Sequence, residues 1–136
     1  MASSTKVKKP VLSLIYYDKI PVYFRPGSTD EQVLKEVIDR KSYRRGGISF
    51  EVEQGEHWLD LGANIGAFAV YCLLRGATAD CYEPDPECFR ILTLNASSCK
   101  CVKSAVTHHQ RTRLELYKSA SPGKFYRGTV LQGVKS

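Results

Sequence analysis

The chain has 136 residues, enough for one domain and too few for two ordinary ones. Hydrophobic residues make up 43% and charged residues 25%, a globular composition that excludes disordered and fibrous classes. The net charge of +6 is uneven: residues 1–50 have 10 basic against 5 acidic residues, residues 51–100 have 3 against 8, and residues 101–136 have 7 against 1. Basic ends attract anionic partners. Because no aromatic residues interleave with a basic stripe, we expect a solvated surface and no nucleic-acid partner.

No apolar run approaches the roughly 20 residues that cross a bilayer. The longest candidate, residues 11–17, is soon followed by Lys19 and Pro21. The N-terminal residues have neither the apolar core nor the small-residue cleavage site of a signal peptide. We therefore expect a cytoplasmic protein without a membrane partner.

Five cysteines are an odd number without the spacing of a disulfide framework. Cys99 and Cys101 form a C-x-C, which is not the C-x-x-C of zinc or redox sites. If Cys101 begins a strand beside the strand that holds Cys81, these two thiols could face each other. We expect reduced thiols and assign no metal.

The first 56 residues predict a tail, a hairpin and a helix. Residues 1–9 are polar and basic, and we expect them to be disordered. Residues 10–56 form the next segment, in which residues 11–18 and 20–24 are rich in β-branched and aromatic residues and predict a hairpin. Ser28 and Glu31 have capping-box spacing and start a helix, whose expected buried positions are Val33, Leu34, Val37 and Ile38.

Short strands and helices alternate from residue 57 to residue 118. Strands are expected at 57–61, 78–82 and 101–106, with a candidate fourth at 113–117, and helices at 65–75 and 86–95. This order is typical of βαβ units with a parallel sheet, so the fold class is α/β. Residues 119–136 have no clear period and are expected to be an irregular tail.

A strand ending in Asp60 is followed by a glycine turn with Gly62 and Gly66 before a helix. Glycines let the backbone turn sharply and approach a ligand. Dinucleotide-binding folds show G-x-G-x-x-G instead, and an acid beside the turn disfavours a diphosphate. The pattern therefore favours a nucleoside whose end near the turn is cationic.

Glu83 ends the second expected strand, at the separation where an acid accepts from ribose hydroxyls in nucleotide-binding folds. Pro84 then fixes the chain at the mouth of the site. Each signal is weak alone, but together in one βαβ unit they predict a nucleoside site.

These residues resemble those of S-adenosylmethionine-dependent methyltransferases of the FkbM type. The resemblance rests on D-L-G-A-N-I-G-A-F at 60–68 and Y-E-P-D-P-E-C-F at 82–89, with further similarity at 25–37 and 102–107. It implies a Rossmann-like class I methyltransferase fold and S-adenosyl-L-methionine as cofactor. It also implies O-methylation of a small-molecule or carbohydrate acceptor.

The resemblance implies a cofactor site made by nine residues. Five surround the methionine part, Glu83 holds the ribose hydroxyls, Pro84 and Asp85 border the adenine, and Ala105 lies at the adenine edge. The five around the methionine are Asp60, Gly62, Ala63, Asn64 and Gly66. His108 and His109 are the only paired titratable candidates near the sheet edge, and we expect them in an exposed loop. We assign no catalytic residue.

The family's next landmark, a strand reading approximately D-x-x-K-I-D-V-E-G, does not occur after Tyr117. We therefore expect a fold truncated after about the fourth core strand, with an unfinished sheet edge that offers a surface for self-association. The alternative function is a truncated relative with weak or no turnover that binds the cofactor or acts as an interaction module. A nucleotide-dependent oxidoreductase is disfavoured by the glycine spacing.

Overall fold

The computed structural model describes residues 11–39, 51–106, 115–117 and 129–131. The expected disorder of residues 1–9 lies outside these ranges, as do His108 and His109 and the predicted loop around them. Within the described residues, no helix combines the length and the apolar character needed to cross a membrane.

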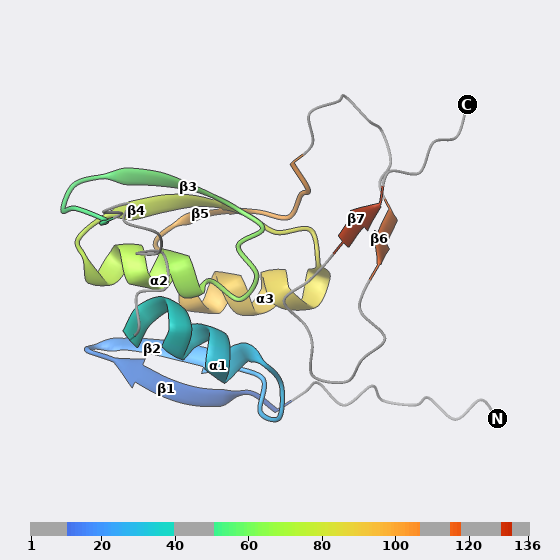
Figure 1. The fold of residues 1–136 in the computed structure, drawn as a ribbon, viewed down its shortest axis with the longest axis horizontal. Helices are drawn as coiled ribbons and strands as arrows, with labels where there is room; N and C mark the ends of the chain where they lie inside the picture. The colour runs from blue at the N-terminus through green and yellow to red at the C-terminus, as the bar shows by residue number, and fades with distance from the viewer. Residues whose placement is uncertain (1–10, 40–50, 107–114, 118–128, 132–136) are drawn as a thin grey trace.

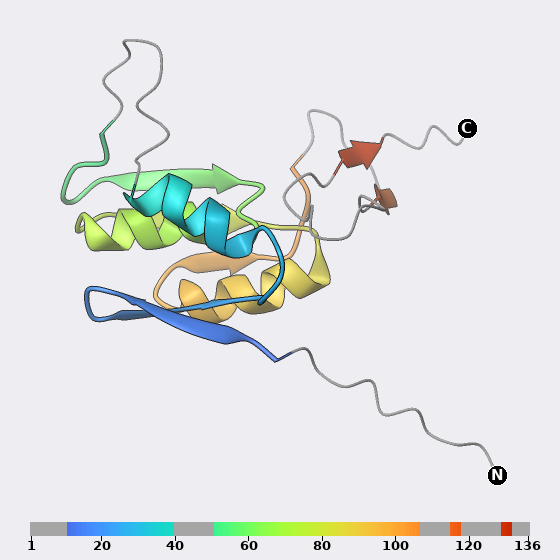
Figure 2. The same cartoon turned by 60° about the horizontal axis from the view of Figure 1, so that its bottom comes forward.

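The described residues form an α/β arrangement that is layered around two central helices (Figure 1). Three strands make a parallel sheet, and α2 (Ala67–Leu74) and α3 (Pro86–Asn95) lie against one of its faces. On the far side of these helices lie α1 (Asp30–Leu34) and the hairpin of β1 (Ser13–Tyr17) and β2 (Ile20–Phe24). Figure 2, turned by 60°, shows α1 in front of α2 and the hairpin next to α3. The predicted α/β class is confirmed.

The sheet has the order β3-β4-β5 and is parallel throughout. It consists of β3 (His57–Leu61), β4 (Thr78–Tyr82) and β5 (Lys100–Val102). The register pairs Asp60 with Cys81, and Cys81 in turn with Cys101. Each crossover contains a helix, as a parallel connection requires. The three strands therefore end at one edge, where the turns after β3 and β4 meet.

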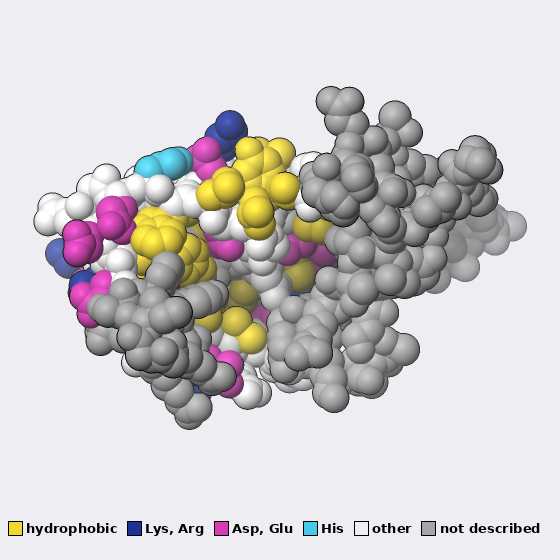
Figure 3. All heavy atoms as spheres, turned by 45° about the horizontal axis from the view of Figure 1, so that its top comes forward, with side chains coloured by type: hydrophobic (Ala, Val, Ile, Leu, Met, Phe, Trp, Pro, Cys, Tyr) yellow, Lys and Arg dark blue, Asp and Glu magenta, His cyan; other side chains and the backbone are white. Residues whose placement is uncertain are grey.

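Among the described residues, helices cover only one face of this sheet. Leu59 and Leu61, which alternate with inward-facing residues of β3, are 61% and 52% exposed. Figure 3 brings this face forward and shows hydrophobic side chains gathered on it beside acidic and histidine side chains. The inward-facing residues of β4, Ala79 and Cys81, are buried against the helices.

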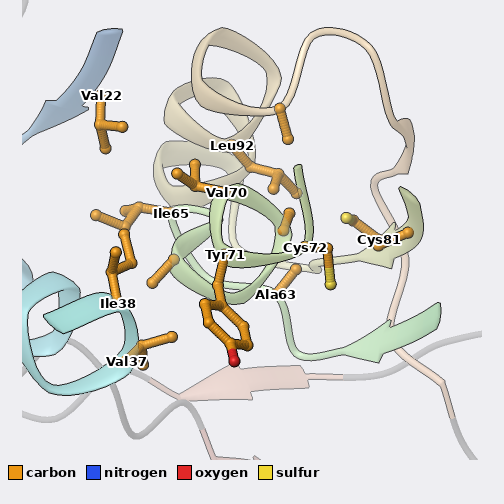
Figure 4. Packing of buried hydrophobic residues seen from close by; sticks show 14 of the residues in the cluster. Val22, Val37, Ile38, Ala63, Ile65, Val70, Tyr71, Cys72, Cys81 and Leu92 are labelled. Carbon is orange, nitrogen blue, oxygen red and sulfur yellow. The ribbon is translucent and has the colours of Figure 1, made fainter. Parts of the chain in front are cut away.

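Hydrophobic side chains from every layer form one core (Figure 4). Val22 of β2 and Ile38 lie on one side of the central helices, and Cys81 of β4 lies on the other. Val70 of α2 and Leu92 of α3 are fully buried between them. The hairpin and α1 are thus part of the same core as the sheet.

The helix predicted after Ser28 forms with a different N-cap and a different end. Its N-cap is Thr29, whose side chain makes no capping hydrogen bond, while the Ser28 hydroxyl accepts the Asp30 N–H at 3.2 Å and donates to the Arg25 carbonyl at 2.7 Å. The expected capping box is therefore wrong, and Glu31 instead forms an ion pair with Lys35 at 2.9 Å. After α1 the chain continues as a π-helical turn, η1 (Lys35–Asp39). Of the four expected buried positions only Val33 is partly exposed.

The two central helices begin and end close to where the sequence predicts. Asp85 is the N-cap of α3 and accepts the Cys88 N–H at 3.1 Å, and Pro86 is the first helical residue. Gly76 follows α2 with a positive φ of 75°, the left-handed conformation that ends helices.

Two expectations about the C-terminal part differ from the structure in part. The candidate fourth strand is present as β6 (Glu115–Tyr117), but it pairs antiparallel with β7 (Thr129–Leu131) in a separate two-stranded sheet. The parallel sheet therefore has three described strands, and residues 119–136 are not wholly irregular. The partner of β6 is a segment with no clear period, which is why the sequence does not indicate the pairing.

Asn95, at the C-terminal end of α3, joins three parts of the structure. Its side-chain oxygen accepts the Tyr23 N–H at 2.6 Å, and its amide nitrogen donates to the carbonyls of Tyr23 and Ile65 at 2.9 and 2.8 Å. Asn95 is buried, so these backbone groups of β2 and the glycine turn have little access to water. The side chain fixes the hairpin against the turn.

We predict that Asn95→Ala lowers the free energy of unfolding by about 3 kcal/mol, because it leaves buried backbone groups without partners. Asn95→Asp keeps the acceptor for Tyr23 and loses the two donated bonds, and should also be destabilised. Urea unfolding followed by circular dichroism measures both. A loss below about 0.5 kcal/mol for Asn95→Ala, the size of an ordinary surface substitution, would contradict this role.

Candidate functional site

The candidate residues gather where β3 and β4 end. Asp60 is the penultimate residue of β3, and the turn of residues 62–66 follows it into α2. Glu83, Pro84 and Asp85 lie between β4 and α3. Hydrogen bonds hold the two connections together: the N–H groups of Gly62 and Ala63 both donate to the Tyr82 carbonyl, at 2.9 and 3.0 Å.

Three residues of the turn have left-handed backbone conformations. The φ angles are +78° at Gly62, +53° at Asn64 and +95° at Gly66. Glycine adopts this region freely, and asparagine tolerates it better than most residues. The sequence therefore matches the conformation at each of the three positions.

The two glycines serve different purposes. A Cβ built on Gly66 would lie 2.9 Å from the Leu92 side chain, so this glycine lets α3 pack closely against the turn. A Cβ built on Gly62 would meet nothing within 4 Å. The sequence predicts ligand contact at both positions, but Gly62 has open space beside it, whereas Gly66 is buried among protein atoms.

Most backbone donors of the turn are already used. Besides the two bonds to Tyr82, the Gly66 N–H donates to the Ala63 carbonyl at 2.9 Å, and the Asn64 N–H donates to the Glu83 carboxylate at 2.8 Å. Sites for phosphate depend on free N–H groups that point at the anion. At these four residues the turn does not offer such a set.

Asp60 brings a half-buried acid to this turn. Its Oδ2 atom is buried and accepts no hydrogen bond from the residues that the structure describes, and the same holds for the Asn64 side-chain oxygen. Burial, with a smaller contribution from the charge of Glu83, raises the pKa of Asp60 from 3.8 to about 6. A buried carboxylate without partners is unfavourable, so a cation or a donor beside Asp60 would stabilise its ionised form.

Glu83 connects the two turns through its carboxylate. One oxygen accepts the Asn64 N–H and the other accepts the Asp85 N–H, both at 2.8 Å. The residue is only 7% exposed, and burial raises its pKa although these two bonds and the charge of Arg25 oppose the shift. Each carboxylate oxygen keeps further acceptor capacity, since a carboxylate has about four lone-pair sites.

The remaining predicted residues occupy different places. Asp85 is buried and caps α3, and the intermediate exposure of Pro84 places it at the surface of the same connection. Ala63 is buried within the turn. Ala105 lies beyond the end of β5, where its carbonyl accepts from the Ser104 hydroxyl at 3.1 Å. Hydrogen bonds join Glu83 to Asn64 and Asp85, and none of those described joins Ala105 to them.

An ion pair that no sequence pattern predicts lies next to this connection. The Arg25 Nε and Nη2 atoms donate to the two carboxylate oxygens of Asp30 at 2.8 and 2.9 Å, and both residues are buried. Arg25 also reaches Cys88 of α3 at 3.6 Å and Glu87 at 3.5 Å. The residues before α1 are thereby tied to the first turn of α3, directly after Glu83 and Asp85.

A surface pocket lies apart from the candidate residues, and no cluster of metal ligands accompanies them in the described part of the chain. A surface pocket of about 280 Å³ is lined by Ser28, Glu31, Gln32 and Lys35, and none of the candidate residues lines it. Within the described ranges, no three His, Cys, Asp or Glu residues are arranged to hold a metal ion.

No family model matches the chain, and no curated protein matches it. The FkbM resemblance of the two motifs therefore stays a prediction, and the chemistry of the site has to be inferred from its own residues.

We predict that Gly66→Ala destabilises the protein more than Gly62→Ala does. Both substitutions place a Cβ at positive φ, at a cost of about 1 kcal/mol. Gly66→Ala also crowds Leu92 and should cost about 1–3 kcal/mol more. Chemical denaturation of both variants gives the comparison. Equal losses would contradict the different roles of the two glycines.

Proposed function

We propose that the chain binds S-adenosyl-L-methionine at the carboxyl edge of its sheet and transfers the methyl group to oxygen of a small or sugar-like acceptor, as FkbM-type methyltransferases do. The observation that carries the proposal is the buried Asp60 oxygen without a hydrogen-bond partner among the described residues, beside a turn whose donors are used internally. This combination favours a ligand that brings positive charge.

The negative charge of the site favours this cofactor over a dinucleotide. Asp60 and Glu83 place two acids at the turn, and the charge of Glu83 adds to the burial that raises the pKa of Asp60. A diphosphate would be repelled by them and would find few free N–H groups, whereas an ammonium group would donate to Asp60. The open space beside Gly62 gives the ligand room to approach the backbone.

Glu83 supports the nucleoside part of the proposal. Its two oxygens are fixed by the Asn64 and Asp85 N–H groups, so the carboxylate is held in one orientation before any ligand arrives. The remaining lone pairs can accept from two adjacent ribose hydroxyls. Pro84 and Asp85 follow directly, where the adenine would lie.

The bound cofactor would supply an electrophilic methyl group. The part played by Asp60 and Glu83 is to bind and orient, because methyl transfer depends mainly on holding donor and acceptor in line. No described residue is assigned as a base.

We expect titration calorimetry to detect S-adenosylmethionine binding and no comparable binding of a nicotinamide dinucleotide. Asp60→Asn should weaken binding by about 1–3 kcal/mol through loss of a charge-assisted hydrogen bond. Asp80→Asn is the matched control, because Asp80 lies on the same sheet but its carboxylate contacts His57 at 3.1 Å. Tighter binding of the dinucleotide, or an equal loss in both variants, would contradict the proposed site.

Methyl transfer itself needs a separate measurement. The purified chain is mixed with cofactor and a panel of hydroxylated acceptors, and S-adenosylhomocysteine is followed. Release that depends on acceptor and falls in Asp60→Asn supports the transferase. Binding without release supports the alternative, a cofactor-binding protein with weak or no turnover.

The raised pKa of Asp60 predicts a pH-dependent cost to stability. Because the folded-state pKa of about 6 lies above the unfolded value near 3.8, the folded protein holds the proton more tightly, and the free energy of unfolding falls as the pH rises from about 4 through 6. The free energy of unfolding of Asp60→Asn minus that of wild type should therefore grow between pH 4 and pH 7, by up to about 3 kcal/mol. A pH-independent difference in urea unfolding would contradict the burial of this acid.

A further inference from the structure

Two cysteines lie opposite each other in the parallel sheet. Cys81 is on the central strand β4, and the register pairs it directly with Cys101 of β5. The sequence predicts this arrangement only on the condition that Cys101 belongs to a strand beside β4, and Cys101 is the middle residue of β5. Both thiols are free in the structure.

Both side chains point to the face of the sheet that the helices cover. Cys81 is fully buried in the hydrophobic core, and Cys101 packs against the same core. The Cys101 sulfur lies 3.7 Å from the carbonyl oxygen of Ala96, the residue that ends α3. Side chains alternate along each strand, so register partners on neighbouring parallel strands share a face. The two thiols are therefore neighbours on the covered face.

The spacing of the sheet suits a disulfide between these two positions. Neighbouring strands lie about 4.8 Å apart, and a disulfide joins residues whose Cα atoms are about 4.4–6.8 Å apart. Within the described residues, β5 is a three-residue edge strand that pairs with β4 alone. A small shift of β5 can therefore bring the two sulfurs to bonding distance without moving β3.

The other cysteines are less well placed for a bond with Cys101. Cys88 is in the first turn of α3, where Arg25 donates to its sulfur at 3.6 Å, whereas Cys101 lies near the opposite end of this helix. Cys99 precedes β5 and has no partner in the register. Cys72 is fully buried on α2. Because Cys101 is partly exposed, a small reagent from solvent reaches it before the buried Cys81.

We propose that Cys81 and Cys101 form a disulfide when the chain meets a low-molecular-weight disulfide such as oxidised glutathione. The Cys101 thiolate attacks one sulfur of the reagent, the S–S bond of the reagent breaks, and the leaving thiolate takes up the proton that Cys101 has lost. The Cys81 sulfur then attacks the Cys101 sulfur of this mixed disulfide, and the second thiol leaves with the Cys81 proton. The two cysteines are thereby oxidised, and the reagent is reduced to two thiols.

The bond connects two strands directly before the candidate site. The next register pair is Tyr82 with Val102, and the Glu83 N–H donates to the Val102 carbonyl at 3.1 Å. Oxidation therefore fixes the strand ends that hold Glu83. The thiol pair itself does not depend on which ligand this edge binds.

The pairing is open to a direct test, because trypsin separates the cysteines. Cleavage after lysine and arginine places Cys81 and Cys88 in peptide 76–90, Cys99 in peptide 91–100 and Cys101 in peptide 101–103. The folded chain is incubated with oxidised glutathione, alkylated, digested and analysed by mass spectrometry. The incubation is made at mildly alkaline pH, because burial raises the pKa of Cys101 and the thiolate is the nucleophile. We expect peptide 76–90 joined to peptide 101–103 through Cys81, with a loss of two of the five free thiols.

Two matched variants complete the experiment. Cys101→Ser should abolish the linked peptide, whereas Cys99→Ser, which changes the other partly exposed thiol, should keep it. A link from peptide 76–90 to peptide 91–100, a link through Cys88, glutathione retained on Cys101 without any link, or five unchanged thiols would each overturn the proposal. The wild-type map decides the pairing even if one variant fails to fold.

Discussion

The candidate site depends on the two hydrogen bonds that the Glu83 carboxylate accepts. The carboxylate accepts one N–H from the turn after β3 and one from the connection after β4, so two segments from different strands take up one arrangement. The backbone N–H of Glu83 donates to the carbonyl of Val102 at the end of β5. A single acid thus links the ends of all three parallel strands. The same fixed geometry, with acceptor capacity to spare, is what recognition of a ribose requires.

The hairpin and the residues before α1 support the carboxyl edge of the sheet through their contacts with α3 and the glycine turn. Asn95 binds β2 to the end of α3 and to Ile65 of the glycine turn, and Arg25 binds the residues before α1 to the start of α3. Both ends of α3 are therefore fixed by polar contacts with the N-terminal segment. The close approach of Leu92 to Gly66 completes the support of the turn. The arrangement explains why the hairpin shares one core with the sheet.

The sequence predicts features that depend on neighbouring residues better than those that depend on distant ones. Asp85 with Pro86 marks the start of α3, and Gly76 marks the end of α2, because caps are local. The turn residues also match their φ angles. The sequence does not reveal the three bonds of Asn95, since Tyr23 and Asn95 lie 72 residues apart. The Arg25–Asp30 pair joins residues only five apart, but no helix or strand spacing marks it. The pairing of β6 with β7 is missed because the segment that holds β7 has no clear period.

The central claim is that Gly62–Asn64 and Glu83–Asp85 form one binding site for S-adenosylmethionine. The most direct measurement is a titration of the isotope-labelled chain with this cofactor, followed by the backbone amide resonances. The account predicts that the amides of both segments shift along one saturable curve, while that of Gln32, at the surface pocket beside α1, does not. Shifts confined to other parts of the chain, or to only one of the two segments, would contradict it.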